Sequence, residues 1–569
     1  MSRVNAGFAC LFLAVLVAGR GAVAQIPADA PRVSGSVETS VLELDVVVTD
    51  KDGKPVIGLG PSDFEVRIGK KPVEITNFYE RKPGPPLAAV PGGELTAGAL
   101  PAPAEAVRPP RHVVLFVDRL QLLDKWKAEA TFDALRLLLR RVVVAPGDDA
   151  MIVTWNRSVE TVIPFTSDLA PIERALAREE ALCRRPSETD AGLRQLGDEA
   201  AWFRALPKES VSGGVDVSRR AGAAGAYAQM RAKANALKAV FATLGGLPGR
   251  KIVVHASYRF SEIAGLEYML AGQDPYGEGA LDRAEFNAYG IVESVAAAAN
   301  ANGVTLYTLF PSGWPDDAQV LHADAPLSSY PKINSLVEGA RGDMIAQNEV
   351  AALTPVATET GGTFAMGYQE ASALASRVAA DLESAYSLGV EAPVGNVGKA
   401  LAVDVKTRDR SLNVRTRRTF FEKTPEGRVR DRVLANLFRP ERDSRLTVTL
   451  AEAKTETKKG KTTVWLTLNV PVAQLARTPS KAGETGAFSV FVACTTAHGT
   501  FTDVIRQRQP FEVKGADHAR AQAGHYTYVL PIVLASPQGL ISVAVWDEVG
   551  LDAALLLVDV SEGKASVRR

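Results

Sequence analysis

Apolar residues along the chain follow two patterns, short continuous runs and longer runs spaced three or four residues apart, and the two alternate over residues 111–390. Residues 112–117 (HVVLFV) and 304–310 (VTLYTLF) are continuous, as strands buried on both faces should be. Between such runs, segments such as 128–141 place apolar residues at helical spacing. This alternation predicts a mostly parallel sheet with helices on both faces, interrupted by a polar insertion at 183–221.

The segments on either side of this region are rich in predicted strands. Residues 38–80 alternate with period two around the turn Asp52-Gly53, and residues 387–420 contain three short strand-like runs. A Pro-, Ala- and Gly-rich linker, 82–110, separates the first flank from the central region. Because neither flank has enough strands to bury a core alone, we hypothesise that the two pair into one β-sandwich with 111–386 inserted between them.

The C-terminal part of the chain is again β-rich. Residues 417–439 are charged and are interpreted as a connector, and 440–569 contain short strand-like runs separated by polar turns. This spacing is typical of an antiparallel β-sandwich. The predicted fold class is therefore α/β plus all-β, with a mostly parallel α/β domain flanked by β-sandwich modules.

The N-terminus has the features of a secretory signal. Arg3 precedes an apolar run from Ala6 to Ala18, which is too short to span a bilayer, and Ala22-Val23-Ala24 provides the small residues of a cleavage site. We expect cleavage before Gln25, export to the periplasm or outside the cell, and no membrane span in the mature chain. An uncleaved anchor is the alternative.

Composition excludes some classes of protein. The 569 residues are 46% hydrophobic and 23% charged, with 65 basic and 65 acidic residues, and removal of residues 1–24 leaves a net charge of −2. The balance argues against a nucleic-acid partner and a polybasic membrane binder, and the apolar content argues against disorder. Cys183 and Cys494 remain after cleavage in different predicted domains, so we expect two separate buried thiols rather than a pair.

Several segments, taken in order, resemble the acidobacterial secreted proteins with a von Willebrand factor A (VWFA)-related domain. They are VVVTDKDGKPVIGLGPSDFEV at 46–66, HVVLFVD at 112–118, PGDDAMIVTWNRSVETVIPFTSD at 146–168, GRKIVVHAS at 249–257, GGTF at 361–364, DLESAYSLGVEAP at 381–393 and LNVRTRR at 412–418. The resemblance covers most of residues 38–420. It implies a Rossmann-like von Willebrand A domain at 111–386, fused to β-sandwich modules, and a non-enzymatic role in binding other proteins.

The resemblance also implies a Mg²⁺ site at the C-terminal edge of the sheet, and here this chain departs from the pattern. Asp118 occupies the first ligand position, but Leu120 and Leu122 stand where two serines are expected, and leucine has no oxygen ligand. Ala256-Ser257 replaces the expected Asp-Gly. We therefore expect a degenerate metal site and no cofactor. The remaining case for a metal uses Asp118, Asp124 and Ser257, with Asp148 or Asp168 as additional candidates.

Two interpretations of Asp118 stay open. It caps a helix or binds backbone amides at the strand end, or the edge formed by Asp118, Leu120, Leu122, His255, Ala256 and Ser257 binds a partner protein without metal. An Asp118–His255 hydrogen bond is also expected, because the two strands should be neighbours.

The predicted function is that of an exported, non-enzymatic protein of interaction or adhesion type, whose partner is another protein. The first alternative is an exported hydrolase using Asp118, His255 and Ser257, although no recognisable nucleophile motif is present. The second is a structural envelope component that binds through its β modules.

Overall fold

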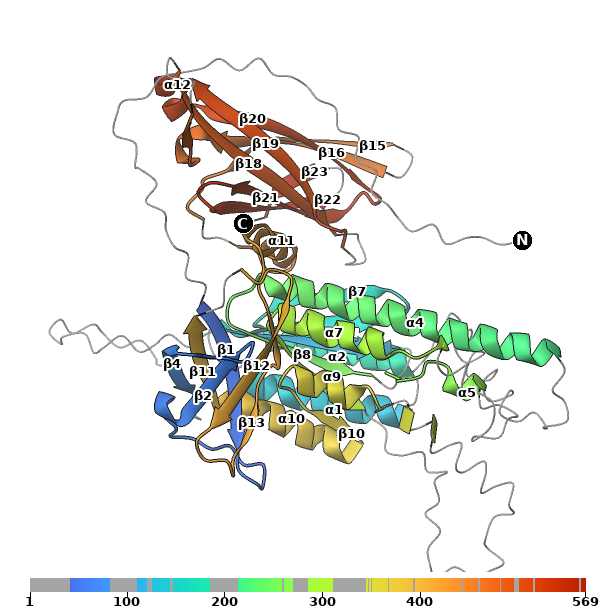
Figure 1. Cartoon of the computed structure of the whole chain (residues 1–569). Coiled ribbons are helices and arrows are strands. Elements are labelled where there is room, and N and C mark those ends of the chain that lie inside the picture. The colour runs from blue at the N-terminus through green and yellow to red at the C-terminus, as the bar shows by residue number, and fades with distance from the viewer. Residues whose placement is uncertain are drawn as a thin grey trace, which may run out of the picture. The chain divides into compact units, whose positions relative to one another are not determined.

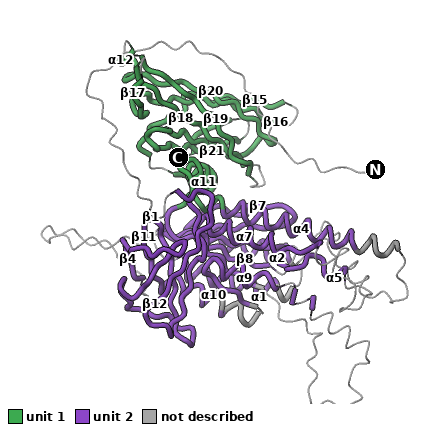
Figure 2. The backbone as a smooth tube through the Cα atoms, viewed as in Figure 1, with its two compact units in different colours: residues 1–39, 242–247, 423–569 green, residues 40–241, 248–422 purple. Residues whose placement is uncertain are grey.

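A computed structural model describes most of the chain in two compact units (Figure 2). One unit contains the described residues of 40–241 and 248–422, and the other contains 242–247 and the described residues of 423–569. The signal segment 1–24, nearly all of the linker and most of the 183–221 insertion lie outside the described residues. Those are 41–81, 110–119, 125–143, 147–184, 213–257, 260–269, 285–310, 344–345, 347–348, 350–366, 368–391, 395–441, 444–458, 461–480, 483–495, 501–514, 517–561 and 564–568.

The first unit contains a β-sandwich built from both flanks of the central region. Its two four-stranded sheets have the orders β13-β1-β11-β4 and β14-β12-β2-β3. The strands are β1 (Val41–Thr49), β2 (Phe64–Ile68), β3 (Lys71–Val73), β4 (Ile75–Arg81), β11 (Ala385–Glu391), β12 (Ala400–Thr407), β13 (Asn413–Arg415) and β14 (Thr419–Phe421), with a 3-10 turn, η1 (Pro61–Asp63), before β2.

Strands more than 300 residues apart in sequence are direct neighbours in this sandwich. Leu44 of β1 lies opposite Leu388 of β11, and Val66 of β2 lies opposite Val405 of β12. Their side chains form one shared hydrophobic core, in which Leu44 and Leu388 are fully buried. The two flanks therefore complete each other, as the hypothesis of an inserted central region requires.

The inserted region forms a six-stranded mixed sheet of order β10-β9-β8-β5-β6-β7. Its strands are β5 (Arg111–Asp118), β6 (Asp149–Trp155), β7 (Val159–Thr166), β8 (Arg250–Ala256), β9 (Val304–Phe310) and β10 (Phe364–Met366). The associated helices are α1 (Lys125–Val142), α2 (Leu169–Arg184), α4 (Gly213–Gly245), α5 (Leu266–Met269), α7 (Tyr289–Ala301), α9 (Leu353–Glu359) and α10 (Tyr368–Glu383), as Figure 1 shows.

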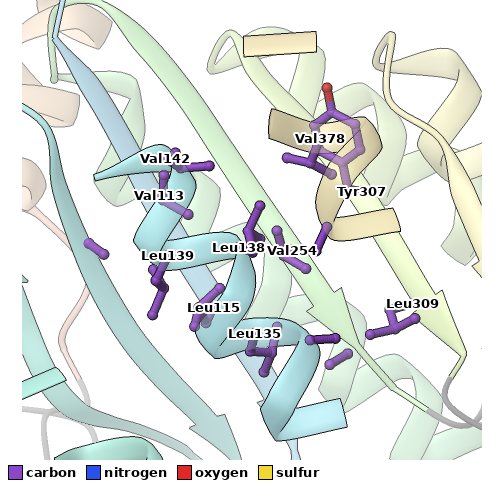
Figure 3. Close-up of a cluster of buried hydrophobic side chains, with 14 of the residues drawn as sticks. Val113, Leu115, Leu135, Leu138, Leu139, Val142, Val254, Tyr307, Leu309 and Val378 are labelled. Carbon is purple, nitrogen blue, oxygen red and sulfur yellow. The ribbon is translucent and has the colours of Figure 1, made fainter. Parts of the chain in front are cut away.

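One face of the mixed sheet packs against α1 and α10. Figure 3 shows Leu135, Leu138 and Leu139 of α1 directed at Val113 and Leu115 of β5, with Val378 of α10 beside Tyr307. All of these side chains are at most 2% exposed. Burial of each large aliphatic side chain stabilises the fold by roughly 1.5–3 kcal/mol, so this cluster fixes the strands that position the candidate site.

The GGTF segment enters β10 through two glycines with different requirements. Gly361 has φ +84°, a conformation that side-chain-bearing residues rarely adopt. A Cβ on Gly362 would lie 1.9 Å from the Leu306 carbonyl oxygen. The backbone therefore approaches β9 more closely than any other residue would permit.

The second unit contains the C-terminal sandwich. One sheet has the order β15-β16-β20; the other has the order β17-β18-β21-β22-β23, with β19 paired to β18. The elements are β15 (Thr449–Lys458), β16 (Lys461–Pro471), η5 (Val472–Gln474), β17 (Thr478–Ser480), β18 (Gly483–Cys494), β19 (Ile505–Lys514), α12 (His518–Ala523), β20 (His525–Leu534), β21 (Gly539–Asp547), β22 (Ala553–Ser561) and β23 (Lys564–Val567). The two sheets enclose one hydrophobic core.

The charged segment predicted as a connector contains a helix, α11 (Pro425–Asn436). Thr424 caps its N-terminus by accepting a hydrogen bond from the Gly427 amide at 2.9 Å. Val429, Val433 and Leu434 are buried where the helix contacts β18, β21 and β22. Residues 423–439 therefore belong to the C-terminal unit rather than linking it to another.

The predicted fold class is wrong for this chain. Fourteen pairings between named strands are antiparallel and four are parallel. The structure is mostly antiparallel and largely sandwich-like, because two sandwiches hold most of the strands. Among the named strands of the described residues, the parallel pairings all lie in one sheet, and that sheet is mixed because β7 runs antiparallel to β6. None of the described helices is long and apolar enough to cross a membrane.

Candidate functional site

The candidate site lies where β5 and β8 end side by side. Asp118 is the last residue of β5, and Ser257 directly follows β8. The parallel register pairs Val117 with Ala256, which places Asp118 and Ser257 next to each other on the same face of the sheet. Helix α4 places the side chain of Lys233 against Asp118 and Ser257.

These three side chains form a closed hydrogen-bonded triangle. Lys233 Nζ donates to Asp118 Oδ2 at 2.8 Å and to Ser257 Oγ at 3.0 Å. Ser257 Oγ donates to the same Asp118 oxygen at 2.9 Å. Asp118 is 1% exposed, Ser257 is 0% exposed and Lys233 is 5% exposed, so the ion pair is withdrawn from solvent.

The positive charge of Lys233 compensates the negative charge of Asp118. An isolated buried carboxylate is strongly unfavourable, and the Lys233 ammonium supplies the positive charge that compensates Asp118. The second carboxylate oxygen, Asp118 Oδ1, is buried and has no hydrogen-bond partner. At this strand end the compensating cation is therefore part of the chain itself.

His255 lies on β8 near the triangle but is not hydrogen-bonded to Asp118. Its ring makes edge contacts with Phe116, at 5.4 Å between ring centroids, and with Phe260, at 5.9 Å. Its Nε2 is buried without a hydrogen-bond partner. Burial, with a smaller contribution from the Lys233 charge, holds the pKa of His255 well below 6.5, so the ring is neutral. The expected Asp118–His255 hydrogen bond is wrong, because aromatic packing holds the imidazole.

The other predicted site residues are distributed differently. Leu120, Leu122 and Asp124 lie outside the described residues, and Ala256 is fully buried. Asp148 accepts a hydrogen bond from the Arg111 amide, at the opposite end of β5. Asp168 accepts one from the Ala170 amide at the start of α2. The structure thus brings together Asp118 and Ser257 of the possible metal ligands and places Asp148 and Asp168 in other roles.

Arg119, the residue after Asp118, forms ion pairs with two acidic side chains. Arg119 lies 3.6 Å from Glu179 and 3.5 Å from Glu160. Burial raises the pKa of Glu179 despite the nearby Arg119. Within the described parts of the chain, no group of three or more His, Cys, Asp or Glu side chains is arranged to hold a metal ion.

Lys233 was not predicted as a site residue, although it is a charged residue on the apolar face of a helix. Met230, Ala234 and Leu237 are buried on one stripe of α4, and Lys233 lies on the same stripe. A single lysine on an apolar helix face needs a buried partner, which points to an acidic residue on the sheet beneath it. The sequence does not show which strand α4 crosses.

A second buried polar cluster joins the sandwich to the mixed sheet within the first unit. Arg415 of β13 makes two hydrogen bonds to the Asp381 carboxylate, at 2.9 and 2.6 Å, and Tyr307 donates a third at 3.0 Å. Arg81 and Arg111 both donate to the Leu382 carbonyl at 3.1 Å. The bonds from Arg81 and Arg111 satisfy a carbonyl group at the C-terminal end of α10, where carbonyl groups lack partners within the helix. The positive charges of the arginines are also favourable at this end of a helix.

The two cysteines belong to different cores. Cys183 is buried in the cluster beneath the mixed sheet, and Cys494 is buried in the core of the C-terminal sandwich. The two residues also fall in different compact units.

No family model and no curated protein matches this chain. Among solved structures, the structural-genomics target SoR45 matches with a TM-score of 0.14 and 13% identity, over 22% of this chain and 88% of that one. The pilus adhesin SpaC from Lactobacillus rhamnosus GG in its open conformation matches with a TM-score of 0.22 and 8% identity, over 92% of this chain and 72% of the adhesin. A second structure of SpaC gives 0.22 and 9%, over 90% and 61%. Likeness at this level is compatible with an adhesion-type protein and carries no argument about fold or function. The resemblance to VWFA-related proteins stays a prediction.

Proposed function

We propose that this chain is an exported, non-enzymatic protein that binds another protein through its folded surface without a metal ion. The signal-like N-terminus supports export. Two β-sandwich modules and a mixed sheet support a role in presenting surfaces rather than in enclosing a substrate. The proposal depends mainly on one observation, the buried triangle of Asp118, Lys233 and Ser257.

The triangle supports binding without metal for an electrostatic reason. A divalent cation beside Asp118 Oδ2 would have to displace an ammonium group already 2.8 Å from that oxygen. It would then meet the positive charge of Lys233 at close range, with one carboxylate to compensate both. The Asp118–Lys233 pair therefore opposes the binding of Mg²⁺ at this edge.

The same contacts argue against the hydrolase alternative. A serine nucleophile needs a base that accepts its proton. The group that accepts a hydrogen bond from Ser257 Oγ is the Asp118 carboxylate, and the same carboxylate oxygen is already paired with the Lys233 ammonium. The ammonium itself has no lone pair and donates to Ser257 Oγ, so it does not act as the base. His255 packs against aromatic rings, and Ser257 is fully buried from solvent.

The direct test immobilises the mature chain, residues 25–569, and captures partners from an extract of the envelope and secreted proteins of the source organism. The capture is made once with Mg²⁺ and once with a chelator. The captured protein is identified, produced separately and titrated against the mature chain. We expect the same dissociation constant in both conditions. Binding that requires Mg²⁺ would overturn the metal-free proposal.

Two variants separate this proposal from its alternatives. Ser257→Ala should leave partner binding unchanged, and loss of a hydrolytic activity in this variant would instead favour the enzyme. Binding retained in full by a fragment containing only 423–569 would favour the structural component that binds through its C-terminal β module.

A further inference from the structure

The segment 415–418 (RTRR), which we call the arginine segment, crosses between the two sheets of the first sandwich. Arg415 is the last residue of β13, which pairs with β1, and Thr419 is the first residue of β14, which pairs with β12. The Arg418 carbonyl also accepts a hydrogen bond from the Val403 amide at 2.8 Å. The sandwich therefore fixes the backbone of the arginine segment at both of its ends.

Two helices of the inserted region end against the arginine segment. Arg417 donates to the Asn300 carbonyl in the last turn of α7, at 3.5 Å. The Arg418 amide donates to the carbonyl of Glu359, the last residue of α9, at 3.0 Å, and the Arg418 guanidinium donates to the Glu359 carboxylate at 3.3 Å. Because the C-terminal end of a helix carries a partial negative charge, the arginine side chains are favourable at these positions.

A third helix, α10, is joined to the arginine segment by a buried ion pair. Arg415 makes two hydrogen bonds to the Asp381 carboxylate in the last turn of α10, and Asp381 is 2% exposed. Only Ser384 separates the last residue of α10 from the first residue of β11 in the sandwich. This helix is thus connected to the sandwich both through the chain and through side chains.

The backbone of the arginine segment also packs closely against the inserted region. A Cβ on Gly361, in the turn after α9, would lie 2.8 Å from the carbonyl carbon of Thr416. Protein interiors packed at this density transmit strain rather than absorb it. A tilt of the sandwich relative to the mixed sheet would therefore break the contacts of all three helices together with this backbone contact.

These contacts lie at the edge of the mixed sheet opposite the candidate site. Arg111 and Arg250 begin β5 and β8, and both donate to carbonyl groups in the last turn of α10. Asp118 ends β5 at the other edge of the sheet. The sandwich is therefore attached on the side of the sheet away from Asp118.

We propose that the arginine segment holds the first sandwich and the inserted region as one rigid body that opens as a single cooperative unit. The two are then not separate modules that swing about the 82–110 connection. The proposal does not depend on the proposed partner binding. It does imply that a partner bound at the Asp118 edge meets the sandwich in one fixed orientation.

Hydrogen exchange of the mature chain, measured by mass spectrometry, tests the proposal. Peptides from β1 report on the sandwich, and peptides from β9 report on the mixed sheet. In a rigid body that opens cooperatively, the most protected amides of both strands exchange through one opening. We therefore expect their protection factors in the wild-type chain to agree and to fall together as denaturant is added.

Two double variants remove contacts of the arginine segment by different routes. Arg415→Met with Asp381→Asn removes the ion pair and leaves no charge buried at position 381. Arg417→Met with Arg418→Met removes the side-chain bonds to the ends of α7 and α9. Neither of these two arginines has a buried carboxylate as its hydrogen-bond partner, so the second variant should fold even if the first does not. Circular dichroism checks that each variant is folded.

The control is Arg410→Met, which removes an exposed ion pair with Glu65 inside the sandwich. Loss of a hydrogen bond to a charged group changes an opening equilibrium roughly tenfold to a hundredfold. In each double variant we expect the protection factors of β1 and β9 to separate by that factor, whereas in the control they should still agree. Protection factors that differ in the wild-type chain, that stay equal in either double variant, or that separate as much in the control would overturn the proposal.

Discussion

Replacement of Lys233 by Met tests the central electrostatic claim. Met keeps much of the length of the lysine side chain and removes its charge. Asp118, 1% exposed, would then retain the hydrogen bond from Ser257 and lose its cation. Removal of one partner from a buried ion pair costs about 3–5 kcal/mol, because the remaining charge is uncompensated. For a unit of this size we expect the unfolding temperature to fall by about 4–6 °C.

Calorimetry of the mature chain provides internal controls for this measurement. Lys233 and Asp118 lie in the unit that contains the mixed sheet, so the unfolding transition of the C-terminal sandwich should not move. Lys238→Met, on the same helix, removes a partly exposed ammonium with one long hydrogen bond to Ser294 at 3.4 Å. It should change stability by about 0.5 kcal/mol or less. If Lys233→Met destabilised the chain no more than Lys238→Met does, the Lys233 ammonium would not be needed to compensate the Asp118 carboxylate.

Four further outcomes are expected. The folded-state pKa of His255 is depressed, so its contribution to stability is present at neutral pH and is lost as pH falls below about 6.5, at up to about 1.4 kcal/mol per pH unit. Thermal unfolding of the His255→Leu variant should therefore depend less on pH below about 6.5 than that of the wild-type chain. Tyr307→Phe should cost about 1 kcal/mol in thermal unfolding, because it removes one hydrogen bond to Asp381. A fragment 423–569 should be more stable than 440–569 by on the order of 5 kcal/mol, because the shorter one loses the buried face of α11; urea unfolding and dye binding measure the difference. Addition of a chelator should leave the unfolding temperature of the mature chain unchanged, because Lys233 supplies the cation beside Asp118, and a decrease would refute this.

The sequence was informative wherever a local pattern reported a local structure. Continuous apolar runs identified β5 and β9, and the short strand-rich flanks implied a shared sandwich because neither could bury a core alone. The fold class was wrong because the alternation at 111–390 was given more weight than the larger number of strands outside it. Helix α11 was missed because its arginines were read as a charged connector, although Val429 and Val433 have helical spacing.

The candidate site was predictable only in part, because it depends on contacts between distant elements. Asp118 and Ser257 could be brought together from the ends of neighbouring parallel strands. The failure of Asp118 to bond His255 could not be foreseen, because it depends on Phe116 and Phe260 enclosing the ring. Lys233 depends on where α4 crosses the sheet, and the amino-acid pattern of the helix does not specify that crossing.

The crossing of α4 also suggests why a buried ion pair is retained. Much of the helix around Lys233 consists of alanine, as at Ala232, Ala234 and Ala236, and such small side chains specify the helix register only weakly. Nearer the start of the helix, Gly222 lies so close to Tyr268 that a Cβ would meet its ring at 2.5 Å. A buried charge has one favourable position, opposite Asp118, and therefore specifies the register of α4 at some cost in stability. The double variant Lys233→Met with Asp118→Leu should thus recover much of the stability lost in Lys233→Met, because no buried charge remains. It should also show faster hydrogen exchange along α4 than the wild-type chain. Recovery of stability with unchanged exchange would show that apolar packing alone fixes the helix.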